Sequence, residues 1–550
     1  MGSGVRAVEG VPASATRQHR LAVAGAVFVS GGVVLGMEIA ASRVLAPFFG
    51  NSLFVWGSLI GIVLAGLSIG YWAGGILADR WPEPRLLAAV MGIGALGVLS
   101  IPVLDGPVLE AIVEWDPGPR LNPLLAAVAL FGAPSIVLAG VAPIAVRLHA
   151  RSLSTLGETA GRLFAISTAG SIAGTFATAF WLIPEFGTDQ LLGIAAAALF
   201  VAAALFSVVE RLVGTAALAL AGAVLAGSAA VALAPETGGT ISEAQARNWS
   251  PLYRRAGSVR GQEPADVAGL TLRYAKDTSY HRLSVADDQT TRYLRFDNTY
   301  QSGMPLARPF GTAFQYADYF HLALAYKPDA RDVLVIGLGG GSSPKRLWRD
   351  FPDLRIQAVE LDPVVVDVAY RFFELPRDDR LQVAVDDGRR WLDDEDRRWD
   401  VIMIDAFFAD AIPFHLFTAE FMELVRSRLN PGGVVITNTI GSITGEQSRL
   451  FRSVYRTYRT AFPTVLVHPV RLPGDGGDDT VRNLMLVATE GAAPDKAFLA
   501  ERWREVRADS RGAPDLTKAI RDRRDADVSV AGVPTLTDDY APTDALLLID

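Results

Sequence analysis

The spacing of hydrophobic and polar residues divides the chain into two unlike parts. Residues 21–234 consist of long runs of Ala, Leu, Val and Gly and contain no lysine. Each of seven apolar segments here is long enough to cross a hydrocarbon core of about 30 Å, which takes roughly 20 helical residues. The pattern therefore predicts a multi-pass α-helical domain that lies in the lipid bilayer of the cell membrane. It follows an amino-terminal tail over 1–20. The segments lie near 21–45, 53–78, 86–104, 121–148, 162–183, 188–209 and 213–234.

The arginines near these segments indicate which end faces the cytoplasm. They gather in the amino-terminal tail and in alternate connections, whereas 46–52 and 184–189 carry none. Because positive charge favours the cytoplasmic side, the amino terminus is expected there. Seven crossings would then put the second part of the chain outside, unless one segment is re-entrant. The amphipathic stretch 105–115 could enter the membrane without crossing it. We expect the second part in the cytoplasm because the ligand argued below is supplied there, and the parity stays open.

The second part of the chain has the pattern of a soluble protein. Residues 235–269 are rich in Pro, Gly and polar side chains and are expected to form a linker. Over 270–310 apolar and polar residues alternate around turn signals such as ADDQ, which predicts antiparallel hairpins in a small sheet. Strand and helix signals then alternate over 311–490, which predicts a parallel, doubly wound, Rossmann-like sheet. Residues 491–550 are expected to be a carboxy-terminal extension.

A glycine-rich turn follows the first strand of that predicted sheet. The strand VLVI leads directly into Gly337, Gly339, Gly340 and Gly341, and Glu360 ends the next apolar strand about 20 residues later. Glycines let the backbone turn tightly and approach a ligand, and a carboxylate at that position accepts hydrogen bonds from both hydroxyls of a ribose. The arrangement predicts a nucleoside site.

Further acidic residues follow the later strands. Asp386 or Asp387 ends the third strand, Asp405 ends the fourth, and Asp410 lies just beyond it. Taken singly, each is as well explained as a helix N-cap or a turn residue. Because ligands of such sheets bind outside the carboxyl ends of the strands, acidic residues at successive ends favour a binding site.

Composition narrows the chemistry. The chain has no cysteine, which excludes disulfides, thiolate metal ligands and a cysteine nucleophile. Its six histidines are scattered, so no metal is predicted. Residues 235–550 carry 40 basic and 47 acidic side chains, which favours a cationic partner over nucleic acid.

A series of motifs follows one another within about residues 271–490. They are, in order, LRFDNTYQSG, FQYADYFHLAL, VLVIGLGGGSS, AVELDP, VAVDDGRRWL, MIDAF and LFTAEFMELVRSRLNPGGVV. This series resembles the spermidine synthase family of polyamine aminopropyltransferases. The resemblance implies a sheet of the S-adenosylmethionine-dependent-methyltransferase type and a homodimer. The apolar part, with LSIGYWAGG, and the final LTDDYAP look like the subgroup of this family fused to a membrane segment.

The resemblance also implies roles for particular residues. Glu360 would hold the ribose of decarboxylated S-adenosylmethionine, and Asp387 with Gly388 would contact the adenine amino group. Asp405 matches the first aspartate of the family's DSSDP segment and is the expected base. Three more residues match positions near the ligand: Gln301, Tyr280 and His281, the last standing where the family more often has glutamine. Tyr316 and Asp318 match the residues that face the amine substrate, such as putrescine.

The chain departs from the family pattern at several of these positions. Gly340 replaces the aspartate of the family's GGGDGG loop, and Phe408 stands where the second aspartate of DSSDP belongs, with Asp410 two residues later. The family's later substrate tyrosine has no clear counterpart unless Tyr540 supplies it, together with Asp538 and Asp539.

Three functions stay open on these grounds. The first is aminopropyl transfer from decarboxylated S-adenosylmethionine to putrescine or a related amine, releasing methylthioadenosine. The second is a transferase that uses S-adenosylmethionine itself with another acceptor, which the glycine-only loop favours because backbone N–H groups then receive the methionine carboxylate. The third is a non-catalytic polyamine or nucleoside sensor or transporter, favoured by the ionisable Glu38 and Arg43 inside the first apolar segment.

Overall fold

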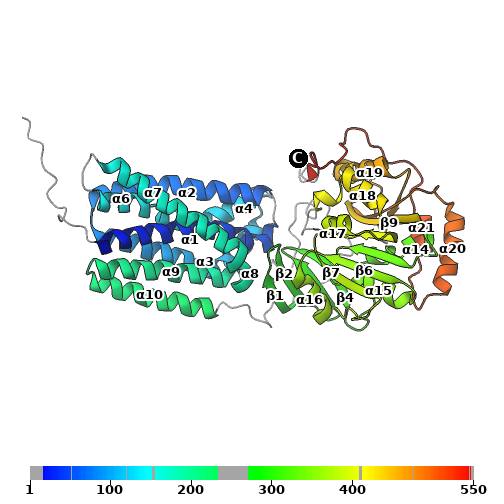
Figure 1. Cartoon of the computed structure of the whole chain (residues 1–550), viewed down its shortest axis with the longest axis horizontal. Helices are drawn as coiled ribbons and strands as arrows, with labels where there is room; N and C mark the ends of the chain where they lie inside the picture. Colours follow the sequence, from blue (N-terminus) through cyan, green and yellow to red (C-terminus); the bar gives the residue numbers. More distant parts are fainter. Residues whose placement is uncertain are drawn as a thin grey trace, which may run out of the picture. The chain divides into compact units, whose positions relative to one another are not determined.

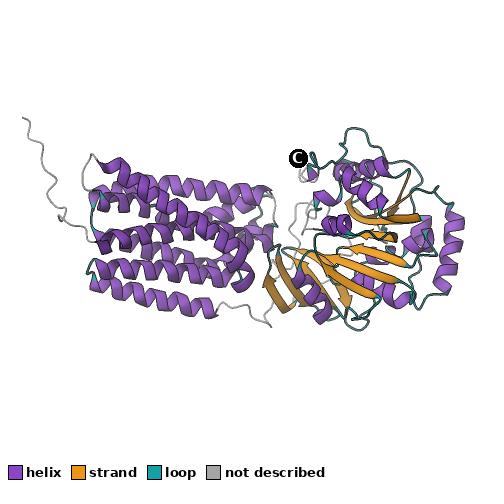
Figure 2. Cartoon of the chain, viewed as in Figure 1, coloured by secondary structure: helices purple, strands orange, loops and turns teal. Residues whose placement is uncertain are grey.

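The computed structural model of the chain describes residues 17–50, 53–118, 120–150, 155–232, 270–407, 412–472, 475–543 and 546. They fall into two compact units, drawn in Figure 1 along the sequence and in Figure 2 by secondary structure. The helical unit is Met1–Glu236 with Lys276–Ser279, and the α/β unit is Thr237–Ala275 with Tyr280–Asp550. The predicted linker over 235–269 lies outside the described residues, as do residues 1–16 of the predicted tail.

Among its described residues, the helical unit contains seven helices that are long and apolar enough to cross a membrane. Each predicted segment corresponds to one of them. The stretch 105–115 is not a separate dipping element, because it continues the third helix without a break to Trp115. The helices are α1 (Arg17–Phe49), α2 (Leu53–Arg80), α3 (Pro84–Trp115), α4 to α6 (Leu121–Ala127, Ala133–Ala139, Val141–His149), α7 and α8 (Leu156–Ala177, Ile183–Phe186), α9 (Thr188–Val209) and α10 (Val213–Ala232).

Glycines bring helix backbones of this unit into direct contact. A Cβ atom added at Gly174 of α7 would lie 2.1 Å from the carbonyl oxygen of Gly32 in α1. One added at Gly70 of α2 would lie 2.2 Å from the carbonyl oxygen of Ile136 in α5. Small residues permit this approach, which supplies packing energy where the surroundings are as apolar as the helices themselves.

Two of the long helices contain a π-helical turn. The first turn, Val128–Gly132, joins α4 to α5, and the second, Thr178–Leu182, joins α7 to α8. Each ends two residues before a proline, Pro134 or Pro184. A proline has no N–H to donate and its ring clashes with the carbonyl four residues earlier, so the helix widens locally rather than ending.

The α/β unit begins with a small four-stranded sheet in the order β1-β2-β3-β4. Its strands are β1 (Thr271–Asp277), β2 (Arg282–Asp287), β3 (Thr291–Phe296) and β4 (Thr299–Pro305). The β2–β3 turn is closed by Asp288, whose carboxylate accepts the backbone N–H groups of Thr290 and Thr291 at 2.7 Å each. At the β3–β4 turn, Asp297 adopts a left-handed φ of 49°, a conformation that Asp tolerates better than most residues. These turns fix the register that aims β4 at the cavity described below.

The main sheet has seven strands in the order β10-β11-β9-β8-β5-β6-β7. The five strands from β9 to β7 are parallel, whereas β11 runs antiparallel between β9 and β10. The strand signals in the sequence end at VVITNTI, so this antiparallel end is an addition to the predicted parallel sheet. Its strands are β5 (Asp332–Ile336), β6 (Arg355–Glu360), β7 (Leu381–Val385), β8 (Trp399–Ile404), β9 (Leu429–Gly441), β10 (Thr464–Pro469) and β11 (Arg482–Thr489).

Helices cover both faces of the main sheet, because its strands are apolar at consecutive positions and neighbouring side chains point to opposite faces. Val333 and Val335 of β5 pack in one core, and Leu334 and Ile336 pack in the other. The first core takes side chains of α14 (Leu322–Tyr326), α15 (Ser342–Asp350), α16 (Pro363–Phe372), α20 (Lys496–Ala508) and α21 (Thr517–Arg521). The second takes side chains of α17 (Gly388–Asp394), α18 (Ala419–Ser427) and α19 (Arg449–Ala461).

The carboxy-terminal extension belongs to this fold rather than trailing from it. Its helices α20 and α21 pack in the first core, whereas its later residue Leu536 is fully buried in the second. Leu536 also donates its backbone N–H to the Thr457 hydroxyl at 2.9 Å and accepts the N–H of Ala419 at 2.9 Å. The extension thus passes from one face of the sheet to the other.

Candidate active site

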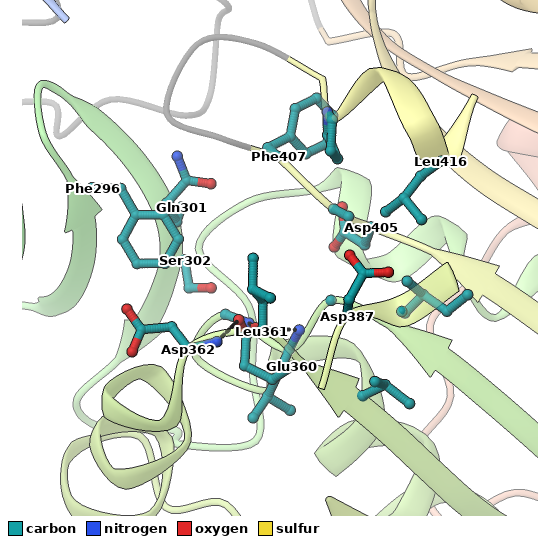
Figure 3. A pocket seen from close by; sticks show the side chains of 18 of the residues that line it. Phe296, Gln301, Ser302, Glu360, Leu361, Asp362, Asp387, Asp405, Phe407 and Leu416 are labelled. Carbon is teal, nitrogen blue, oxygen red and sulfur yellow. Dashed lines mark hydrogen bonds between the residues drawn. The ribbon is translucent and has the colours of Figure 1, made fainter. Parts of the chain in front are cut away.

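A cavity lies in the α/β unit, at the carboxyl ends of β5, β6, β7 and β8. The strand order reverses at β5, which has β6 on one side and β8 on the other, and such a switch point is where sheets of this kind bind ligands. Figure 3 shows Gln301 and Ser302 of the small sheet on one side of the cavity and Asp387 and Asp405 on the other. Its polar lining residues are His281, Gln301, Ser302, Tyr316, Glu360, Asp362, Asp387, Asp405 and His415.

The glycine-rich turn forms the floor of the cavity. Gly337 and Gly339 line it and have φ angles of 93° and 53°, in the left-handed region that favours glycine. Gly340 and Gly341 are not among the lining residues. Gly340 donates its N–H to the Ser302 hydroxyl at 2.8 Å, and a Cβ atom there would lie 2.9 Å from both Ser302 and Phe373. The position taken by aspartate in the family loop therefore has no room for a side chain here unless its neighbours shift.

Glu360, at the end of β6, holds this turn in place. One carboxylate oxygen accepts the N–H groups of Leu338 at 3.0 Å and Gly339 at 3.4 Å, and the other accepts the N–H of Asp362 at 3.0 Å. Burial raises the pKa of Glu360, and these three donors oppose that shift. A carboxylate offers about four acceptor sites, so roughly one remains for a ligand hydroxyl.

Asp387 has two roles in the structure. One oxygen caps α17 by accepting the N–H groups of Arg389 and Arg390 at 3.0 Å each, and the other lies 2.9 Å from Nε2 of His415. The hydrogen bond with His415 is the largest influence that lowers the pKa of Asp387, to about 2. The neighbouring Asp386 instead pairs with Arg390 and does not line the cavity. Gly388 lines the cavity beside Asp387 and packs on Ile336, 2.4 Å from where a Cβ would lie.

Asp405 follows β8 directly. One of its oxygens accepts a hydrogen bond of 2.9 Å from Nδ2 of Asn438 on β9. Among the residues that the structure describes, no lysine, arginine or histidine forms an ion pair with it. Burial therefore raises the pKa of Asp405 to about 6, with Asn438 opposing the shift. A carboxylate with that pKa is ionised at neutral pH and is a stronger base than an exposed aspartate.

Three more of the predicted residues line the cavity. The side-chain amide of Gln301 donates to the Thr299 hydroxyl at 2.7 Å, and the backbone carbonyl oxygen of Gln301 accepts a hydrogen bond from the Tyr316 hydroxyl at 3.3 Å. His281 stacks on Phe296 with ring centroids 3.9 Å apart, and its Nε2 lies 3.7 Å from Asp362. The small sheet thus contributes one wall of the cavity.

The remaining predicted residues lie elsewhere. Asp318, on the short helix α13 (Tyr316–Tyr319), is in an ion pair with Arg346, and Tyr280 is not among the lining residues. Three residues of the carboxy-terminal extension also stand outside the lining: Asp538, Asp539 and Tyr540. Asp538 forms a two-pronged ion pair with Arg389, with both contacts at 2.6 Å. Asp410 lies outside the described residues.

The structure adds residues that sequence reasoning missed. Asp362 and Ser302 line the cavity, and His415 reaches it from a short 3-10 helix (Phe414–Leu416), 28 residues after Asp387. Asn438 stands between Thr437 and Thr439 in the strand VVITNTI, and this polar triplet at the end of an apolar run is the signal that was present for it. His415 has no comparable signal, because a lone histidine in a single 3-10 turn has no periodicity to interpret.

A seven-stranded sheet with one antiparallel end, a glycine-rich turn and an acidic residue after the second strand defines a nucleoside-binding fold of the methyltransferase type. Within that class, residues 314–474 match the family described as spermine/spermidine synthase domain. The α/β unit therefore contains a match to the spermine/spermidine synthase domain.

Curated relatives agree with that assignment. A probable polyamine aminopropyl transferase of Bifidobacterium longum is 28% identical over 280 residues, which cover 50% of this chain and 62% of the relative. The match thus spans less than two thirds of that relative's own length. A polyamine aminopropyltransferase of Corynebacterium efficiens is 28% identical over 470 residues, 79% of this chain and 80% of the relative. A match that long extends beyond the α/β unit into the helical unit.

A relative of another kind matches a shorter stretch. The eEF1A lysine and N-terminal methyltransferase of Bos taurus is 36% identical over 149 residues, which cover 25% of this chain and 21% of the relative.

Proposed function

We propose that the chain is a membrane-anchored aminopropyltransferase that moves the aminopropyl group of decarboxylated S-adenosylmethionine to putrescine or a related amine. The observation that supports this most directly is Asp405, an acidic side chain at the cavity wall that no cationic side chain of the described residues neutralises. A site that must accept a proton from an amine and attract a cation needs such a group.

In the proposed reaction the amine nitrogen attacks the aminopropyl carbon next to the sulfonium. The new C–N bond forms as the C–S bond breaks, and its electron pair returns to sulfur, so methylthioadenosine leaves. The proton released by the attacking nitrogen passes to Asp405. Phe407 and Tyr316 line the cavity and would cover the methylene chain, which excludes water and keeps the two reacting atoms close.

The nucleoside would bind over the glycine-rich turn. Glu360 would accept a ribose hydroxyl with its remaining acceptor site, while it keeps the turn in shape. Asp387 would reach the adenine amino group from the neighbouring strand end, next to Gly388. Because His415 occupies one oxygen of Asp387, an adenine amino group would share that carboxylate with the imidazole.

A second candidate is a transferase that uses S-adenosylmethionine itself. It is favoured by Gly340, where no acidic side chain is present to meet an aminopropyl ammonium, and by the methyltransferase among the relatives. We rank it second, because the family match covers the strand ends that carry Asp387 and Asp405.

The helical unit would anchor the enzyme. Its seven long apolar helices fit a multi-pass membrane domain. Seven crossings from a cytoplasmic amino terminus would put the α/β unit outside, whereas the supply of its nucleoside ligand favours the cytoplasm, which is the side that we propose. A reporter fused near residue 240 tests the side: activity of a cytoplasm-dependent reporter is expected, and activity only of a periplasm-dependent one would overturn the assignment.

The reaction is tested on the purified full chain in detergent. We expect methylthioadenosine release from decarboxylated S-adenosylmethionine only when putrescine or a related amine is present. Release of S-adenosylhomocysteine from S-adenosylmethionine would establish the second candidate instead. Nucleoside binding by calorimetry without turnover of either donor would contradict both.

A further inference from the structure

A line of three polar side chains crosses the main sheet behind the cavity. Asn438 of β9 donates Nδ2–H to Asp405 at 2.9 Å, and Asn483 of β11 donates Nδ2–H to the Asn438 oxygen at 2.9 Å. Both asparagines are buried, with exposed fractions of 2% and 4%. Buried amides have to satisfy their hydrogen bonds within the protein, so their orientation is fixed by their partners.

The strand register places all three on one face of the sheet. Met403 of β8 and Ile436 of β9 belong to the first core, and Asp405 and Asn438 each follow two residues later along the same strands. Met485 of β11 pairs with Asn438 and is in the same core. Side chains two residues apart on a strand share a face, so Asp405, Asn438 and Asn483 form one row at its carboxyl edge.

The chemistry of the three groups sets the direction of the row. An ionised carboxylate only accepts, so Asn438 has to present its amide nitrogen to Asp405. Its amide oxygen then points away and needs a donor, which Asn483 supplies. If Asn438 rotated by half a turn, it would present an oxygen to a carboxylate oxygen and a nitrogen to a nitrogen, so the observed orientation is the stable one.

We propose that Asn438, held by Asn483, is a positioning residue for the transfer reaction: it binds one oxygen of Asp405 and thereby keeps the other turned to the attacking amine. This inference rests on the proposed function for the identity of the amine, but the coupling between Asn438 and Asp405 does not. The hydrogen bond from Asn438 also fixes the orientation of the Asp405 carboxylate. No cationic side chain among the described residues pairs with that carboxylate.

Two variants of the row and one control test the proposal in the full chain. Asn438→Ala removes the donor to Asp405, and Asn483→Ala removes the group that orients it. Thr439→Ala is the control, because Thr439 also bridges β9 and β11, donating to the Leu484 carbonyl oxygen at 2.8 Å, but has no contact with Asp405. Each variant removes a buried side chain that forms hydrogen bonds on β9 or β11, two for Asn438 and one for Thr439, so a merely structural role would lower stability in all three without moving the titration of Asp405.

The first readout is the titration of Asp405 itself, followed by its infrared carboxyl band. The band is isolated by subtracting the spectrum of the same protein carrying Asp405→Asn. We expect Asn438→Ala to move this titration upward by about one pH unit, since a donor to the charged form is lost. Asn483→Ala should move it in the same direction by less, and Thr439→Ala should leave it in place. The other titratable groups at the cavity are common to every variant: His281, Tyr316, Glu360, Asp362, Asp387 and His415.

The second readout is methylthioadenosine release with putrescine. Asn438→Ala should lower kcat by about tenfold to a hundredfold at neutral pH and shift the acid limb of the rate profile upward, with the donor KM little changed. An unmoved Asp405 titration in Asn438→Ala, or equal effects of Thr439→Ala, would overturn the proposal. If the wild-type chain released no methylthioadenosine with any amine, the proposed function would fail, while the infrared titration would still decide the coupling.

Discussion

Gly337 lies directly against the backbone carbonyl group of Asp405: a Cβ atom at Gly337 would sit 2.2 Å from that oxygen. The turn that would receive the nucleoside and the strand end that carries the expected base are therefore one packed unit, although 68 positions separate them in the sequence. Movement of one displaces the other.

Gly337→Ala should consequently damage folding and binding together. The substitution combines a left-handed φ of 93° with a collision against backbone, so we expect the free energy of unfolding to fall by about 3 kcal/mol or more. Nucleoside affinity should be lost. Gly432→Ala is the matched control, because Gly432 has a φ of 72° with no atom within 4 Å of its added Cβ. Calorimetric unfolding should show a loss of only about 1–2 kcal/mol there.

The rate of transfer should fall in acid. Asp405 acts as a base only when ionised, and its pKa is raised to about 6 by burial. We expect kcat/KM for putrescine to be level above pH 7 and to drop tenfold per unit well below pH 6. A profile that stays level down to pH 5 would remove Asp405 as the base.

The same carboxylate should make the protein less stable at neutral pH. The folded state binds this proton more tightly than the unfolded chain, where the pKa is near 4, so stability falls as pH rises from about 4 to above 6. Asp405→Asn should therefore abolish turnover and raise the unfolding temperature at pH 8 but not at pH 4. Scanning calorimetry at both values checks it, and nucleoside affinity should stay near that of the wild-type protein.

For the pair of Asp387 and His415 we expect the opposite dependence of stability on pH. The folded pKa of Asp387 is lowered to about 2, so the pair adds stability above pH 4 that is lost as pH falls toward 2. The gain is at most about 1 kcal/mol, because the side chains are 31% and 30% exposed. We expect His415→Ala to reduce stability at pH 5 in urea unfolding and to have no effect at pH 2. A loss that is the same at both pH values would point to packing instead.

Asp538 and Asp539 should behave differently although they are neighbours. Asp538 holds Arg389, which also donates to the carbonyl oxygen of His415 at 3.1 Å. Asp538→Asn should loosen the 3-10 helix that carries His415 and raise KM for the nucleoside several-fold, with the KM for putrescine unchanged. Asp539→Asn is the control and should resemble the wild-type enzyme. A common rise in the amine KM would instead support both aspartates as substrate ligands.

The sequence was sufficient for features that depend on neighbouring residues. The glycine-rich turn, Glu360 and the alternation of strands and helices follow from local pattern, and all appear in the fold. The parallel direction of the five strands from β9 to β7 also followed from that alternation, whereas the antiparallel direction of β11 did not. Every residue of β11 is buried, so it presents an apolar run that looks alike in parallel and antiparallel sheets.

Pairing between distant residues was the other limit. Asp318 matches a substrate-facing position, yet the chain carries Arg346 on α15 to pair with it. The Arg389–Asp538 pair joins residues 149 positions apart. Such contacts depend on the arrangement of helices around the sheet, which no periodicity of a single segment encodes.

The passage of the extension across the sheet has a consequence for synthesis in the cell. Leu536 fills the second core only after residue 536 has left the ribosome, whereas the helical segments emerge hundreds of residues earlier. The α/β unit therefore cannot complete its core during most of translation. A premature stop near residue 490 would produce a chain with a complete helical unit and an incompletely folded α/β unit, a natural target for proteases.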